Sequence, residues 1–341
     1  MTSTNTPRGQ RGDSWQLMDQ LEKAPGFKVM ADTLADLTDE GYPVAVCTAD
    51  LKYSNGMIRY QERHPHRFIQ FGISEQNMVS ASSGIATTGL KPYVATFASF
   101  LALLCCEQIR TDVAYGAQSV RLIGHHSGIT LGFYGTSHHA TEDLAIMRSI
   151  ADISVVAPAD PASFEAALRA TVDHDGPIYF RIGRGREPEV YAMGDMAFEL
   201  GKAVVHSRGE DLTLVATGSM VHPSLAAADT LREEGLSVGV IDVHTVKPLD
   251  EEAILEAAGN TSNMMTVEEH NVLGGLGGAV AEVLSQANAD TSLHRHGIRD
   301  EYSLIGPPTH LYKHYRLDAD GITEEARHFL GTEHSSTDAD R

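Results

Sequence analysis

The sequence FGISEQNMVSASSGIATTGLKPYVATFASF, residues 71–100, predicts a helix, a turn and a buried strand in succession. Glu75 lies at the start of the predicted helix, whose body over residues 80–86 consists almost entirely of Ser, Ala and Gly. Such small side chains allow a neighbouring helix or a second subunit to approach closely. Gly89 is placed to end the helix. The short apolar run over residues 93–98 is typical of a buried strand.

The predicted strand ends in two aromatic residues, Phe97 and Phe100, that follow the carboxylate of Glu75 in the chain. A carboxylate beside two aromatic rings is a suitable pocket for a flat, basic heterocycle. The same residues also fit a helix-terminal acid and two ordinary core phenylalanines. Pattern alone leaves both interpretations open.

Composition excludes several classes of function. The chain has 341 residues, 42% of them hydrophobic, which is enough for about two soluble domains. Its formal net charge of −20 disfavours nucleic acid and anionic membranes as partners, because their phosphates would be repelled. No apolar run approaches the roughly 20 residues of a membrane span, and the N-terminus lacks the apolar core of a signal peptide. We therefore expect a cytoplasmic protein.

Strands alternate with helices along most of the chain, which predicts an α/β fold with parallel sheets. We expect two domains, at 26–185 and 201–330, joined by a linker at 186–200 and flanked by tails at 1–25 and 331–341. Polar loops follow three of the predicted strands. Because the carboxyl ends of parallel strands meet at one edge, these loops are expected to share a site.

The loop over residues 125–139 is rich in glycine and contains four histidines, His125, His126, His138 and His139. Zinc sites usually need three or four convergent ligands, and no cysteine or cluster of acids accompanies these residues. We therefore expect no metal ligands in this chain. Histidines that bind hydroxyl groups and an anion in a substrate pocket fit the pattern better. Ser54 and Arg181, on the other two loops, are candidates to join them.

Several motifs together resemble the C-terminal half of transketolase. They are Ala49-Asp50-Leu51 with Ser54-Asn55, Gly72-Ile73-Ser74-Glu75-Gln76-Asn77-Met78, Thr96-Phe97-Ala98-Ser99-Phe100, Gly135-Thr136-Ser137-His138-His139, and Val267-Glu268-Glu269-His270. The resemblance covers residues 26–330. It implies a parallel-sheet domain that binds the pyrimidine of thiamine diphosphate, followed by a smaller α/β transketolase C-terminal domain.

The resemblance also implies roles for single residues. Glu75 matches the glutamate that hydrogen-bonds the aminopyrimidine of thiamine diphosphate, and it and His138 are the expected catalytic residues. The cofactor-binding set that it implies is Glu75, Phe97, Phe100 and Asp50. The substrate-binding set is Ser54, His126, His138, Arg181 and Tyr134. Tyr134 stands where the family usually has an aspartate, and an early phosphate-binding arginine is missing, although Lys28 is nearby. Both departures bear on which sugar is used.

No diphosphate-binding Gly-Asp-Gly motif is present, so the chain looks like one subunit of a split transketolase. The resemblance implies an N-terminal partner subunit that carries the diphosphate domain and most ligands of Mg²⁺ or Ca²⁺. It implies an α2β2 assembly and transfer of a two-carbon ketol unit from a ketose, phosphorylated or otherwise modified, to an aldose. The alternatives are the β subunit of a 2-oxoacid dehydrogenase first component, a deoxyxylulose-phosphate-synthase-like enzyme, and a non-catalytic paralogue.

Overall fold

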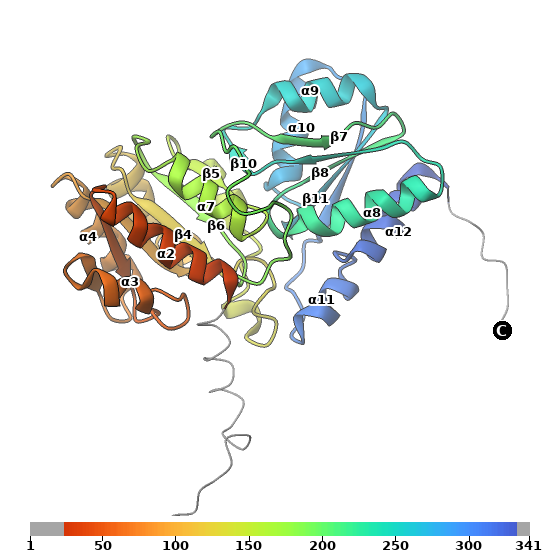
Figure 1. Cartoon of the computed structure of the whole chain (residues 1–341). Helices are drawn as coiled ribbons and strands as arrows, with labels where there is room; N and C mark the ends of the chain where they lie inside the picture. Colours follow the sequence, from red (N-terminus) through yellow and green to blue (C-terminus); the bar gives the residue numbers. More distant parts are fainter. Residues whose placement is uncertain (1–23, 333–341) are drawn as a thin grey trace, which may run out of the picture.

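The computed structural model describes residues 24–332, in which two sheets are each covered by helices on both faces (Figure 1). The predicted tails at 1–25 and 331–341 lie almost entirely outside the described residues. The two sheets lie in adjacent lobes, with the N-terminal half of the chain in one and most of the C-terminal half in the other. The predicted two-domain α/β architecture is confirmed.

The first sheet has seven strands in the order β10-β5-β6-β4-β3-β1-β2. All its neighbouring pairs are parallel except β10 with β5. The strands are β1 (Val44–Thr48), β2 (Phe68–Gln70), β3 (Lys91–Phe97), β4 (Arg121–His125), β5 (Ser154–Val156), β6 (Ile178–Arg181) and β10 (Thr245–Lys247). The central strands β1, β4 and β6 are buried along their whole length, which explains their continuous apolar sequences.

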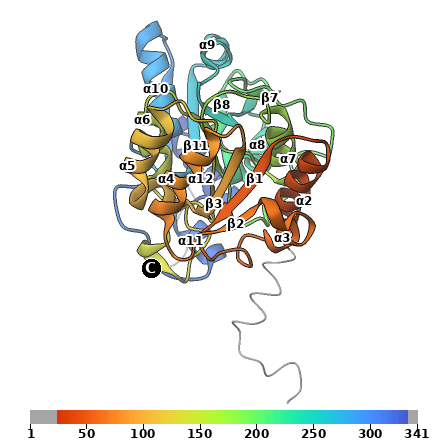
Figure 2. The same ribbon diagram turned by 90° about the vertical axis from the view of Figure 1, so that its left-hand side faces the viewer.

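Two apolar cores hold this sheet between helices. On one face are α2 (Pro25–Asp39), α3 (Ile58–Arg63) and α7 (Pro161–Ala170), which begins at a capping box formed by Asp160 and Ser163. On the other face are α4 (Glu75–Ala86), α6 (Asp143–Ser149) and the helical segment from η3 (Phe100–Leu104) through α5 (Cys106–Gln108) to η4 (Ile109–Ala114). Figure 2 views the molecule from the side of α4 and β1.

The second sheet has five strands in the order β12-β11-β8-β9-β7, of which only β7 is antiparallel to its neighbour. The strands are β7 (Val204–Ser207), β8 (Leu212–Ala216), β9 (Val238–Asp242), β11 (Asn263–Asn271) and β12 (Ser292–Ile298). One face carries α8 (Val221–Glu233), α11 (Pro308–His314) and α12 (Ala319–Leu330). The other carries α9 (Glu251–Asn260) and α10 (Leu276–Ala287).

Two features of the structure are not evident from the sequence. Residues 100–114 do not form one regular α-helix, because η3 and η4 are π-helical segments on either side of a single short α-turn. Insertions of this kind occur frequently at functional sites. In addition, β10 belongs to the C-terminal half of the sequence but completes the edge of the first sheet (Figure 1). The two lobes therefore share a sheet.

The small-residue helix α4 packs closely against another helix of the same chain. Ser80 and Ser83 donate hydrogen bonds of 2.6 Å to the side chain and the carbonyl of Asp112 in η4. Beyond this contact Gly84 faces open space, and Ile73, just before the helix, is 85% exposed. No helix within residues 24–332 is long and apolar enough to cross a bilayer.

Candidate active site

Strands β6, β4, β3 and β1 are adjacent and parallel, so the loops that follow them begin at one edge of the sheet. Backbone hydrogen bonds join two of the loops directly. His126 donates to the Gly183 carbonyl at 2.8 Å, and Ser127 donates to that of Ile182 at 3.1 Å. The histidine loop after β4 and the arginine loop after β6 are thereby held side by side.

Phe97, at the end of β3, is the centre of a cluster of aromatic and imidazole rings. Its ring centroid lies 5.3 Å from that of Phe100, 5.2 Å from His126 and 5.2 Å from His138, each in an edge-to-face arrangement. Phe97 and Phe100 are only half-buried, so they are not ordinary core residues. The cluster therefore leaves part of its aromatic surface accessible, and the pocket interpretation remains a prediction.

His125 and His126 are neutral because they are buried next to each other. Burial lowers the pKa of His125 to about 3, and burial with the neighbouring charges of His125 and Arg184 holds the pKa of His126 well below its usual value. Their Nδ1 atoms lie 2.8 Å apart, so one must donate and the other accept. The Nε2 atom of His125 is buried without a partner among the described residues. His126 has a positive φ of 55°, which turns its ring toward Phe97 and Phe27.

His138 is the accessible histidine of the cluster. Its ring is 5.2 Å from Phe100 and 4.9 Å from Tyr134, and its Nδ1 lies 2.9 Å from the Ser137 hydroxyl. Partial burial lowers the pKa of His138, which favours the neutral ring at physiological pH. Tyr134 is about half exposed and lies on the outer side of this ring. A neutral, accessible imidazole beside an exposed phenol is able to bind a sugar hydroxyl or transfer a proton.

Glu75 is the first residue of α4 and is only 9% exposed. Across residues 24–332, no group donates a hydrogen bond to its carboxylate. The next residue, Gln76, donates to the Leu104 carbonyl at 2.9 Å, which fixes the start of α4 against the end of η3. The charge of Glu75, after burial, contributes to the raised pKa of the Cys105 thiol in the same region. An unpartnered, nearly buried carboxylate is an available acceptor for a ligand N–H group.

The sequence did not reveal what holds the histidine loop in place. The carboxylate of Glu269, in β11 of the second sheet, accepts hydrogen bonds from the Ile129 N–H at 2.7 Å, the Ser219 hydroxyl at 2.8 Å and the Tyr312 hydroxyl at 2.9 Å. Gly128 has a φ of +58°, and a Cβ there would lie 2.2 Å from the Glu269 carboxyl carbon. The second domain therefore shapes the site of the first domain through Glu269.

The adjacent Glu268 has a different structural role. Its two oxygens accept hydrogen bonds from the Leu276 and Gly277 N–H groups at 2.7 and 2.8 Å, at the start of α10. A carboxylate at a helix N-terminus stabilises the unpaired N–H groups there. Glu268 thus holds α10 to β11 within the second domain, whereas Glu269 joins the two domains.

The predictions for Asp50 and Ser54 remain predictions. Asp50 follows β1 with an exposed side chain and a φ of 59°, and its N–H donates to Gln70 at 2.6 Å. Ser54 is half-buried in the turn that follows. The neighbouring Asn55 is fully buried and donates to Thr48 at 3.3 Å, which fastens this turn to the strand. Neither Asp50 nor Ser54 belongs to the ring cluster around Phe97.

The prediction that Arg181 binds substrate remains a prediction, and the structure gives this residue a structural role. Arg181 is 3% exposed, and its Nε lies 2.9 Å from the Asp143 carboxylate in a buried ion pair. Its Nη2 donates to the carbonyls of Glu269 at 2.8 Å and Ala140 at 3.2 Å. The guanidinium thus joins β6 to α6 and to the second domain. Its position at a strand end suggested a ligand contact, but the side chain points into the protein.

Arg184, three residues further along the same loop, is placed as we expected of Arg181. Its Nε is buried without a hydrogen-bond partner among the described residues. Burial and the charge of Arg186 lower its pKa, and its own charge lowers that of His126. Tyr134 also acts electrostatically on Arg184. The sequence does not indicate which of Arg181, Arg184 and Arg186 would bind an anion. Only the structure shows that Arg181 is paired with Asp143 and that the Nε of Arg184 is buried without a partner among the described residues.

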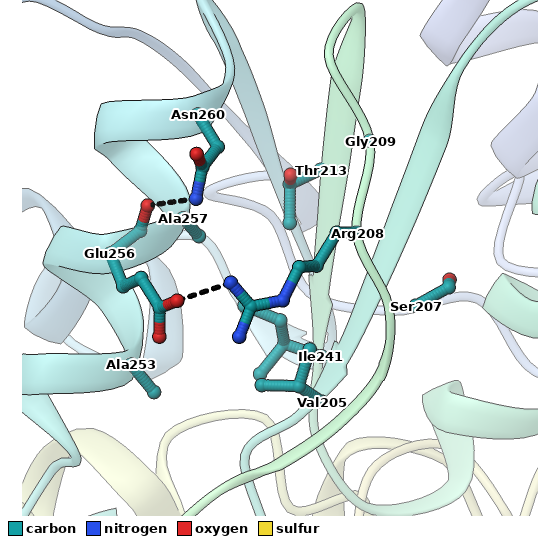
Figure 3. A pocket seen from close by; sticks show the side chains of 10 residues that line it. All are labelled: Val205, Ser207, Arg208, Gly209, Thr213, Ile241, Ala253, Glu256, Ala257 and Asn260. Atoms are coloured by element: carbon teal, nitrogen blue, oxygen red, sulfur yellow. Dashed lines mark hydrogen bonds and ion pairs between the residues drawn. The ribbon is translucent and has the colours of Figure 1, made fainter.

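Another cavity does not resemble a functional site. It lies between the second sheet and α9, beside the ion pair of Arg208 and Glu256 (Figure 3). Its volume of about 20 Å³ is enough for about one water molecule. We assign it no function.

Two family descriptions match the chain. "Transketolase, pyrimidine binding domain" matches residues 23–188, and "Transketolase, C-terminal domain" matches residues 201–322. These ranges contain the ring cluster and the Glu269 anchor, respectively.

Similar proteins of nearly the same length include one of the subunits of an apulose-4-phosphate transketolase from Phocaeicola vulgatus. It is 35% identical over 303 residues, which are 89% of this chain and 96% of the relative. A 6-deoxy-6-sulfo-D-fructose transketolase subunit from Clostridium sp. is 36% identical over 295 residues, 86% of this chain and 91% of the relative. A solved structure described as a split gene transketolase, inactive beta4 tetramer, is 35% identical with a TM-score of 0.80, covering 90% of this chain and 98% of that one. The resemblance seen in the sequence is confirmed, and this chain belongs to the transketolase family, of which it comprises the pyrimidine-binding and C-terminal domains.

Proposed function

We propose that this chain is the C-terminal subunit of a thiamine-diphosphate-dependent transketolase that transfers a two-carbon ketol unit from an anionic ketose to an aldose. The observations that carry the proposal are the unpartnered Glu75 carboxylate at the start of α4 and the ring cluster of Phe97, Phe100 and His138. The start of α4 is bonded to η3, the segment that begins with Phe100, so the acceptor and the rings come from elements that pack together.

The residues present fit the aminopyrimidine of thiamine diphosphate. Glu75 is available to accept from a ring nitrogen, and the half-buried rings of Phe97 and Phe100 are available to pack on a flat heterocycle. When bound, thiamine diphosphate supplies the carbon nucleophile of ketol transfer. The role of Glu75 is to set the protonation of the pyrimidine, because a carboxylate acceptor favours a proton on the nitrogen that it faces.

The substrate side of the pocket is suited to an anionic sugar. His126 and His138 are held neutral by burial, so they act as hydrogen-bond partners of hydroxyl or carbonyl oxygens and not as fixed charges. Arg184 provides the fixed positive charge, and the geometry favours it as the ligand of a phosphate or sulfonate. The names of the two relatives, a sugar phosphate and a sulfosugar transketolase subunit, are consistent with an anionic substrate. Ser54, Asp50 and Tyr134 remain candidates at the rim.

A partner subunit completes the proposed enzyme. The sequence has no diphosphate-binding motif, so we propose that a partner chain holds the diphosphate together with Mg²⁺, in a cytoplasmic α2β2 assembly. Exposed apolar side chains near α4, η3 and η4 support contacts between subunits: Ile73 is 85% exposed, Leu103 54%, Leu104 52% and Tyr115 91%. The related split gene transketolase structure is described as a beta4 tetramer, which is consistent with self-association of this kind of subunit.

The first test is to purify the tagged chain from cells of its own source and to assay the eluate for thiamine diphosphate, a second polypeptide and ketol transfer. A panel of phosphorylated and sulfonated ketoses, with matched uncharged ketoses, would serve as donors. We expect transfer that depends on thiamine diphosphate and a preference for anionic donors. A complex that instead decarboxylates a 2-oxoacid and acylates a lipoyl domain would establish the dehydrogenase alternative. Condensation of pyruvate with an aldose phosphate would establish the synthase alternative.

A further inference from the structure

A second cluster of ligand-type side chains lies in the other domain, outside the site described above. His294, His296 and Glu325 each place one ligand atom within 4.8 Å of the others. Among residues 24–332, it is the one group of three or more His, Cys, Asp or Glu side chains whose ligand atoms lie this close together. His294 and His296 are two residues apart on β12 and so point to the same face of the strand. Glu325 reaches them from α12, which packs on that face.

The cluster is held in place before any ligand arrives. The Nε2 of His296 donates to the Arg316 carbonyl at 2.6 Å, which fixes its tautomer and orientation, as is common for metal-binding histidines. The His294 ring lies between Phe329, with centroids 5.3 Å apart, and His296, at 6.4 Å. One oxygen of Glu325 accepts from Arg316 at 3.1 Å, while the other lies 3.5 Å from the His294 Nε2. The 3.5 Å between Glu325 and His294 suits two ligands of one tetrahedral ion at roughly 2.0–2.2 Å each, and the ligand atom of His296 lies within 4.8 Å of both.

Burial also suits a metal site. The His296 and Glu325 residues are 6% and 7% exposed, whereas the His294 side chain is 31% exposed. The cluster opens into a cavity of about 600 Å³ whose walls also include Arg299 and Arg316. This space leaves a fourth position for water or a small anion.

We propose that His294, His296 and Glu325 form a site for a zinc-like transition-metal ion with one open coordination position. Two imidazoles and a carboxylate favour Zn²⁺ or Co²⁺ over Mg²⁺ and Ca²⁺, which prefer oxygen ligands only. The proposal does not depend on the proposed function. Because Arg316 offsets part of the charge of Glu325, we expect a moderate affinity.

The test uses the untagged chain after removal of metal with a chelator. Binding of Zn²⁺ is measured by calorimetry, and Co²⁺ is added to record its visible absorption, which is stronger in four-coordinate than in six-coordinate geometry. The variants are His294→Gln and Glu325→Gln. The matched control is His222→Gln, which changes an exposed histidine of α8 outside the cluster.

We expect one Zn²⁺ per wild-type chain, a loss of affinity of at least ~10-fold in both cluster variants, and unchanged binding in the control. Zinc should also raise the unfolding temperature of the wild type and the control but not of the cluster variants. Circular dichroism of the metal-free proteins separates lost binding from lost folding, and Glu325→Gln retains the shape of the side chain. Absence of Zn²⁺ binding by the wild type, or equal binding by the wild type and both cluster variants, would overturn the proposal.

Discussion

Substitution by Met should have different effects at Arg181, the last residue of β6, and at Arg184, three residues later. Arg181→Met should lower stability, whereas Arg184→Met should raise the KM for an anionic substrate. Arg181 forms a buried ion pair with Asp143 and also donates to two carbonyls, one of them in the second domain. Removing one partner of a buried pair leaves an uncompensated charge, at a cost of about 3–5 kcal/mol. With a urea m-value of about 2 kcal/mol/M, the unfolding midpoint of Arg181→Met should fall by ~1.5–2.5 M.

Arg184→Met should leave the urea midpoint nearly unchanged, because Arg184 forms no ion pair among residues 24–332 and its Nε has no partner. Loss of one charged hydrogen bond to a substrate anion costs about 1.5–3 kcal/mol, which corresponds to a KM for the anionic ketose raised ~10- to 100-fold. The KM for a matched uncharged ketose should change little. The measurements are urea unfolding of the chain and steady-state kinetics of the complex with its partner subunit.

The reasoning fails if Arg181→Met unfolds at the wild-type urea concentration and instead raises the KM for anionic ketoses. It also fails if Arg184→Met changes neither KM nor the preference between charged and uncharged donors. The first result would mean that the buried guanidinium of Arg181 binds the substrate, and the second would remove Arg184 as the ligand of the substrate anion.

Three further substitutions test other parts of the structure. Burial raises the pKa of Asp242 from 3.8 to about 7, so between these pH values the folded chain holds a proton that the unfolded chain has released. The free energy of unfolding should therefore fall by ~4 kcal/mol as pH rises through this range. Asp242→Asn should flatten this part of a plot of unfolding free energy against pH, and an unchanged plot would contradict the assignment. In Glu269→Gln, one of the three donors to the carboxylate would face the NH₂ group of the new side chain. We expect the free energy of unfolding to fall by about 1–3 kcal/mol and the backbone of residues 128–140 to exchange its hydrogens faster. Exchange at the wild-type rate would argue against the role of Glu269 in holding this loop. Phe97→Leu removes the central ring of the cluster. The thiamine diphosphate concentration needed for half-maximal activity should rise by up to ~10-fold. If Phe97 is only a core residue, this concentration should not change.

The first sheet was largely predictable because its strands are buried on both faces and its helices have clear starts and ends. The 93–98 strand prediction corresponds to β3 at Lys91–Phe97, and Gly89, with a φ of +88°, follows the helix that begins at Glu75. Short elements with mixed burial were harder. Strand β10 has only three residues, and it is specified by pairing with β5, more than 80 residues earlier in the chain.

Residues of the candidate site were predictable where the residue type near a strand end is enough to suggest a ligand contact. Phe97 and His138 are examples, and their rings lie in contact in the structure. The site was not predictable where side-chain direction decides, as for Arg181 and Arg184, or where the partner is distant in sequence. Glu269 contacts a backbone N–H that is 140 residues away, and nothing in the local pattern indicates it. The ends of strands are therefore readable from sequence, whereas the pairing of buried charges requires the fold.

The most direct test of the proposed function is ketol transfer by the complex of partner subunit and Glu75→Gln. Gln retains the size of the side chain but lacks the charge that sets the protonation of the pyrimidine, and loss of a positioned acid–base group typically costs ~10²–10⁴-fold in rate. We expect such a loss in kcat while the complex still assembles and binds thiamine diphosphate. Wild-type kcat in an intact Glu75→Gln complex would contradict the proposed role of this subunit in catalysis.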